Sequence, residues 1–141
     1  MTERANTYYF ADKRFQIAKI LNETVIKALT HHSVRDHAKR YMIYDMENMC
    51  IAFSRKDLKQ KTKVKIYLTE ADKCFLKLDR QTKYLTADGT LSDTKHIVDC
   101  QINEDGSISF PMPEGLLASG KDGRAEFSSL QKKTTKYQLA K

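Results

Sequence analysis

The chain has 141 residues, of which 40% are hydrophobic and 30% are charged, and its net charge is +7 at pH 7. This length and apolar content suffice for one domain with its own core, without metals or disulfide bonds. No apolar run reaches the length of about 18 residues that a transmembrane helix needs. The first residues also lack the apolar core of a secretory signal, so we expect synthesis and folding in a cytoplasm.

The positive charge lies mostly before Lys63, with a smaller basic group near the C-terminus. Such a balance favours anionic partners through nonspecific attraction. It does not distinguish a nucleic acid from an acidic protein surface.

The cysteines Cys50, Cys74 and Cys100 are odd in number and widely spaced, and each lies in an apolar stretch. A disulfide framework or a zinc site needs even counts or close pairs. We therefore expect three buried free thiols, because a thiol packs like a small apolar group.

The N-terminal segment 1–33 has the spacing of an amphipathic helix, with Asp12 as a possible N-cap and residues 31–33 at its end. The apolar stripe of this helix contains Ile17, Ile20, Leu21, Val25 and Leu29. A stripe of this kind is a packing face, either against a sheet or against a second copy of the chain. It is our candidate surface for oligomer formation.

Residues 34–53 are open to two interpretations. Val34 and Ala38 fit a second helix that begins at Ser33. The same region also contains two β-rich runs around the polar turn 45–48, which favour a short helical turn followed by a hairpin.

From Lys63 onward the period changes to two, as in 64–68, 74–78, 98–102, 108–110 and 125–127. Alternation of this kind is typical of antiparallel strands with one buried face. Asp-Gly pairs at 88–89, 105–106 and 122–123 predict tight turns.

Pro111 and Pro113 should end a strand, since proline cannot donate to a ladder. Residues 114–118 could then form one helical turn, and residues 131–141 a flexible basic tail. The fold class that follows is α+β in a single domain, with an N-terminal helix before a mainly antiparallel β-sandwich or partly open barrel over residues 41–128.

No catalytic constellation stands out. His31, His32 and His37 lie near Asp36 and could serve a ribonuclease, but a solvated helix end explains them as well. His32 and Asp36 alone do not make a metal site. Asp88, Asp99, Glu104 and Asp105 lie at or next to turns, and no nucleophile motif or phosphate loop is present. We therefore predict a protein that is not an enzyme and has no cofactor and no metal.

A basic set is the candidate surface for an anionic partner: Arg14, Arg35, Lys39, Arg40, Arg55, Lys56, Lys59 and Lys61. The aromatic residues near it could stack on bases of a single-stranded nucleic acid. They are Tyr8, Tyr9, Phe10, Tyr41 and Tyr44.

Residues 64–128 contain a strand at 64–68, a DGT turn at 88–90, the string DGSISF at 105–110, the segment PEGLLASG at 113–120 and the closing AEF at 125–127. This order resembles the N-terminal β-sandwich module of tailed-phage baseplate upper proteins, which attach receptor-binding proteins to the baseplate. Here a helical segment precedes the module, whereas the family's module heads a longer protein.

The resemblance implies a structural or adaptor protein of a phage tail that works as a symmetric oligomer with other virion or host proteins. Its location would be the virion or the host cytoplasm. An alternative of another class is a small basic protein that acts on nucleic acid or on a host enzyme through the segment before Lys63.

Overall fold

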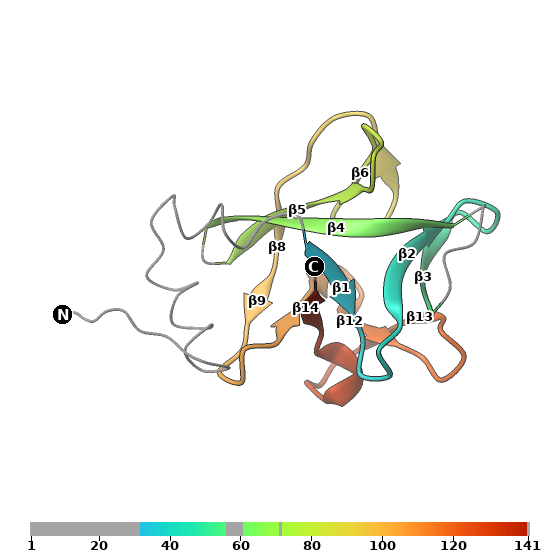
Figure 1. Ribbon diagram of the computed structural model, residues 1–141. Coiled ribbons are helices and arrows are strands. Elements are labelled where there is room, and N and C mark those ends of the chain that lie inside the picture. The colour runs from blue at the N-terminus through green and yellow to red at the C-terminus, as the bar shows by residue number, and fades with distance from the viewer. Residues whose placement is uncertain (1–31, 56–60, 71, 141) are drawn as a thin grey trace.

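The computed structural model describes residues 32–55, 61–70 and 72–140 (Figure 1). Over these ranges the chain is almost entirely antiparallel β-structure, and the 3-10 turn Lys133–Thr135 (η1) is the one helix among them. No helix in these ranges is long and apolar enough to cross a membrane. The predicted mainly antiparallel β-fold is therefore confirmed, whereas the amphipathic stripe Ile17–Leu29 lies outside the described residues.

The strands in chain order are β1 (His32–Arg35), β2 (Tyr41–Asp45), β3 (Cys50–Ser54), β4 (Lys61–Glu70), β5 (Lys73–Leu78), β6 (Tyr84–Leu85), β7 (Leu91–Ser92), β8 (Val98–Asp99), β9 (Gln101–Ile102), β10 (Ile108–Ser109), β11 (Pro111–Met112), β12 (Gly115–Ser119), β13 (Ala125–Ser128) and β14 (Gln138–Ala140). Nine of them form one sheet in the order β14-β1-β2-β4-β5-β6-β7, with β3 paired to β2 and β8 paired to β5. β9 pairs with β10, and β11, β12 and β13 form a three-stranded sheet.

The core lies between the large sheet and the three-stranded sheet, in a sandwich-like arrangement. Val64, Ile66 and Leu68 of β4 point into it and are at most 3% exposed, while Lys65 and Tyr67 between them are half-buried on the other face. Burial of such aliphatic side chains is the main favourable contribution to folding.

Tyr137 is fully buried and ties the C-terminal segment to the core. Its ring stacks on Phe53 at a centroid distance of 5.6 Å and tilts against Phe110 at 5.5 Å. Its hydroxyl donates to the Leu117 carbonyl at 2.9 Å. Because Gln138–Ala140 also pairs with β1, the prediction of a flexible tail at residues 131–141 is wrong over its described part.

The three predicted Asp-Gly turns are confirmed. Gly89, Gly106 and Gly123 have φ angles of 84°, 86° and 89°. These left-handed values are open to glycine without steric cost.

The ambiguity of residues 34–53 resolves as a strand followed by a hairpin. Val34 lies in β1, and β2 and β3 pair from Tyr41↔Ser54 to Asp45↔Cys50. The expected helical turn is wrong, as is the extension of the N-terminal helical segment through residues 32–33. β1 is stabilised as a strand by pairing with β4 and β14. Because these partners lie far away in the sequence, the local pattern did not indicate a strand.

Two further expectations are corrected. Residues 115–119 form strand β12 and not a helical turn, because β11 and β13 flank them on both sides. Pro111 is the first residue of β11, and β10 ends before it at Ser109, as expected. Among the cysteines, Cys74 and Cys100 are buried as expected, but Cys50 is exposed at the β2–β3 hairpin.

Candidate functional site

Strands β3 and β13, from the two different sheets, meet at a single point. Ala52 and Arg124 form an isolated antiparallel bridge, and the Phe53 N–H donates to the Gly123 carbonyl at 2.8 Å. No further ladder pair joins the two strands within the described ranges. We call this line of contact, with the openings at its two ends, the seam; β3 and β13 lie side by side in Figure 1.

At one end of the seam lies an apolar groove of about 260 Å³. Its apolar lining consists of Met49, Cys50, Ile51, Met112, Leu117, Ala125 and Phe127. Asp88, Thr90 and Glu114 supply polar groups to it. Met49 is 76% exposed and Phe127 is 41% exposed, so two large apolar side chains stand open to solvent here.

Phe127 is exposed because β13 is an edge strand. It lies opposite the buried Leu117 in the ladder with β12, on the inward face of the sheet. Beyond Arg124, no strand in the described ranges pairs with the other edge of β13. An edge of this kind presents unpaired backbone N–H and C=O groups to an incoming strand.

At the other end of the seam lies a broad, open hollow of about 620 Å³, which we call the basic hollow. Its lining comes from the turn after β1, the end of β3 and the β12–β13 turn: His37, Ala38, Arg40, Phe53, Ser54, Arg55, Lys121 and Asp122. Arg40 and Arg55, two of the sequence-predicted basic residues, therefore meet here.

Arg40 has a structural task in this hollow. Its Nε donates to the buried Asp36 carboxylate at 2.8 Å. Its two terminal nitrogens donate to the Ser119 hydroxyl at 3.0 Å and to the carbonyls of Gly120 and Lys121 at 2.9 and 3.1 Å. Since four of its five N–H groups are engaged and its charge is balanced by Asp36, Arg40 serves mainly as a wall of the hollow.

The Asp36 carboxylate is stabilised in its charged form. Burial alone raises its pKa, but the Ser119 hydroxyl and the backbone and side-chain N–H groups of Arg40 donate to it and lower the pKa below the usual range. Charged acceptors with several donors behave in this way.

The other charged residues at the hollow differ in whether they have an ion-pair partner. Asp122 pairs with Arg124 at 2.9 Å, and hydrogen bonds from Arg124 lower the pKa of Asp122. Arg55 donates one N–H to the Ala38 carbonyl at 3.1 Å and is exposed, and Lys121 has no ion pair within the described ranges. Among the described residues, Arg55 and Lys121 are therefore the cations of the hollow without an ion pair.

The other predicted basic residues lie elsewhere. The Arg35 guanidinium carbon lies 5.3 Å from the centroid of the Tyr41 ring, and the Nζ of Lys63, which is not in the predicted set, lies 4.3 Å from it. Lys39 is exposed in the turn after β1. Lys61 begins β4, while Arg14, Lys56 and Lys59 lie outside the described residues.

Among the described residues, the aromatic side chains near the basic set are not free to stack on bases. Tyr41 is covered by two cations, and Tyr44 is 3% exposed in the core. Tyr67 and Phe75 on the outer sheet face stack on each other at 4.7 Å, and Lys95 covers Phe75. Tyr8, Tyr9 and Phe10 lie outside the described residues.

The candidate acid–base groups have structural partners. Asp88 accepts hydrogen bonds from Thr86 and Thr90, Asp99 pairs with Lys73, and Asp105 pairs with Lys136 at 3.2 Å. His37 is exposed in a turn, His32 lies in β1, and His31 is outside the described residues. Within the described part of the chain no group of three potential metal ligands exists.

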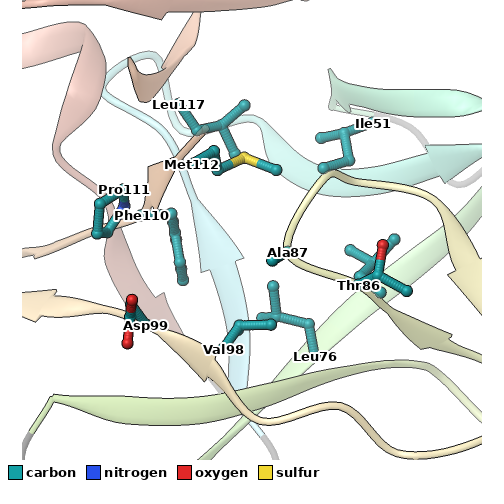
Figure 2. Close-up of a pocket in the computed structure, with 11 residues that line it drawn as sticks. Ile51, Leu76, Thr86, Ala87, Val98, Asp99, Phe110, Pro111, Met112 and Leu117 are labelled. Atoms are coloured by element: carbon teal, nitrogen blue, oxygen red, sulfur yellow. The ribbon is translucent and has the colours of Figure 1, made fainter. Parts of the chain in front are cut away.

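An apolar cavity of about 20 Å³ lies inside the core. Figure 2 shows Leu76 and Val98 of the large sheet on one side of it and Met112 and Leu117 of the three-stranded sheet on the other. A pocket for a small molecule needs roughly 300 Å³ or more. This cavity is a packing space and not a ligand site.

Sequence reasoning missed Lys121, Met49 and Phe127. Lys121 lies in a turn whose only sequence signal is Asp122-Gly123, and Phe127 has the alternation of a buried residue. No protein-family model matches the chain, and no curated protein matches its sequence.

Proposed function

We propose that this chain is a non-enzymatic assembly protein that binds an extended segment of a partner protein in the apolar groove. The observation that carries this proposal is the exposure of Met49 and Phe127 beside the open edge of β13. Apolar surface gathered in a groove with polar groups around it is typical of protein interaction sites.

The form of the groove favours an extended partner segment. β13 offers backbone donors and acceptors along one edge, so an added strand would gain main-chain hydrogen bonds there. Its side chains would cover Met49 and Phe127. Burial of a fully exposed side chain of this size contributes about 1.5–3 kcal/mol, and the gain is smaller for Phe127, which is only 41% exposed. A compact small ligand would leave the strand edge unpaired.

The biological setting that we propose is the tail or baseplate of a phage virion. Its support is the resemblance of residues 64–128 to the baseplate upper-protein module. In this setting the stripe Ile17–Leu29 would add a second, oligomer-forming surface, and the β-sandwich would act as the scaffold that carries both.

Selection of short displayed random peptides on the purified chain tests the groove. We expect enriched peptides with alternating apolar residues, and we expect the double variant Met49→Ser/Phe127→Ser to lose their binding. Leu130→Ser is the matched control, because Leu130 is 72% exposed and lies outside the groove lining. Failure to enrich any peptide, or equal binding by the double variant, would contradict the proposal.

Light scattering over a concentration series tests the oligomer. We expect self-association of the wild-type chain and loss of it in Ile20→Ser/Leu21→Ser. A chain that stays monomeric at its highest soluble concentration would leave no support for the symmetric assembly.

A further inference from the structure

We infer that the basic hollow is a second subsite of the same docking surface and binds carboxylate side chains of the partner segment. The inference rests on the proposed function, because it assigns the partner's chemistry along the seam. The partner segment would then carry apolar residues at one end and acidic residues at the other.

The two subsites lie on the same strand. Met49 lines the groove just before β3, and Arg55 lines the hollow just after it. At about 3.4 Å per residue, the two positions are roughly 20 Å apart, the reach of an extended segment of about six residues. The backbone contacts of Ala52 and Phe53 with the β12–β13 turn lie between the two subsites. A partner segment would therefore pass over the solvent side of these contacts.

The charges of the hollow match a segment with few negative charges. Asp36 balances Arg40 and Asp122 balances Arg124, so Arg55 and Lys121 remain. Complementary charge of this kind gives specificity and orientation at a protein interface.

Carboxylates fit the hollow better than phosphate groups. Phosphate sites commonly present several free backbone N–H groups to the anion. Here the Gly120 and Gly123 N–H groups already donate within the β12–β13 turn, and the Arg124 N–H donates to Asp122. The Asp122 carboxylate at the rim would also repel a densely charged phosphate chain.

The cations are held on fixed backbone. The Arg40 guanidinium joins the turn after β1 to the β12–β13 turn, and Arg55 is anchored on the Ala38 carbonyl. Lys121 therefore projects from a turn whose backbone is tied at Gly120 and Lys121. An anchored side chain such as that of Arg55 loses less conformational freedom when a partner binds.

The test is a titration of the isotope-labelled chain, followed by backbone amide shifts, with a short glutamate peptide as the probe, in which two glutamates stand among serines. We expect shifts at Ala38, Arg55 and Lys121 and weaker binding at higher salt. In Arg55→Gln/Lys121→Gln the dissociation constant should rise about threefold to tenfold, as expected for two exposed ion pairs. Arg80→Gln/Lys133→Gln is the control, since it removes the same charge from exposed residues outside the hollow lining.

Parallel titrations use inorganic phosphate and a short oligothymidylate. Tighter binding of either at the hollow would overturn the carboxylate assignment, and so would the absence of peptide-induced shifts there or equal binding by Arg55→Gln/Lys121→Gln. Met49→Ser/Phe127→Ser should bind the glutamate peptide like the wild type. Failure of the groove is thus seen in the peptide selection, and failure of the hollow in this titration.

Discussion

The Arg40 guanidinium donates to the buried Asp36 carboxylate at 2.8 Å, and the same guanidinium holds the turn between β12 and β13. The hydrogen bonds of this one guanidinium thus join two parts of the chain that lie about 80 residues apart in the sequence. This connection shapes the basic hollow and fixes the end of the seam.

Replacement of Arg40 should therefore destabilise the fold strongly. Arg40→Met leaves the Asp36 carboxylate buried without its cation, and breaking a buried pair in this way costs about 3–5 kcal/mol. Arg40→Lys keeps the charge but loses the planar set of donors, so we expect an intermediate loss. Urea unfolding measures the free energy of unfolding of both variants. A loss of less than about 1 kcal/mol for Arg40→Met would show that the Arg40–Asp36 pair does not stabilise the fold.

The same pair predicts how stability depends on pH. The pKa of Asp36 is lower in the folded chain than in the unfolded chain, so its contribution is complete above the unfolded value. This stabilising contribution of Asp36 is lost as the pH falls below about 4 and through the pKa that Asp36 has in the folded chain. Urea midpoints from pH 7 downward should show the advantage of wild type over Asp36→Asn shrinking in acid. Glu104→Gln, at an exposed residue with no ion pair within the described ranges, should change the midpoints little. A constant difference between wild type and Asp36→Asn across this range would refute the assignment.

Gly123 should tolerate no side chain. Its φ is 89°, and a Cβ there would lie 2.4 Å from the Phe53 carbonyl oxygen, which cannot move without opening the seam. Gly89→Ala is the matched control, because Gly89 has a φ of 84° but its nearest neighbour is the flexible end of Met112 at 3.4 Å. We expect Gly89→Ala to cost about 1–2 kcal/mol and Gly123→Ala clearly more in thermal or urea unfolding. Equal costs would contradict the close contact at the seam.

The three cysteines should differ in reactivity. Cys50 is exposed and lines the groove, whereas Cys74 and Cys100 are buried. A hydrogen bond with Cys100 and burial raise the pKa of the Cys74 thiol well above its usual range, which suppresses the reactive thiolate. A thiol reagent such as Ellman's should therefore label one thiol rapidly in the folded chain, and Cys50→Ser should remove that signal. Rapid labelling of a second thiol would contradict the buried placement, and a bound groove peptide should slow the labelling of Cys50.

The sequence predicted the local features of the fold, because these depend on neighbouring residues. Alternation along 64–68 and 74–78 identified β4 and β5, and the Asp-Gly pairs identified turns at Gly89, Gly106 and Gly123. β1 and β14 were missed because they are stabilised by partners far away in the chain. β12 was missed for another reason: its partners β11 and β13 are its neighbours in the sequence, but the run Leu116-Leu117-Ala118 does not alternate.

The candidate site could be predicted only in part. Arg40 and Arg55 belonged to the basic set, but charge alone does not show that Asp36 balances Arg40 while Arg55 has no ion pair among the described residues. The sequence did not predict the apolar groove for a different reason. Phe127 follows the pattern of a buried residue, and only the sheet order shows that β13 is an edge.

The most direct test of the account is amide-shift mapping of a selected peptide on the isotope-labelled chain. The account predicts that the largest shifts fall on residues 49–51 and 125–127, on both sides of the groove, and that they vanish in Met49→Ser/Phe127→Ser. Shifts that centre instead on Lys65, Lys77 and Tyr84 of the outer sheet face would place the binding surface elsewhere and contradict it.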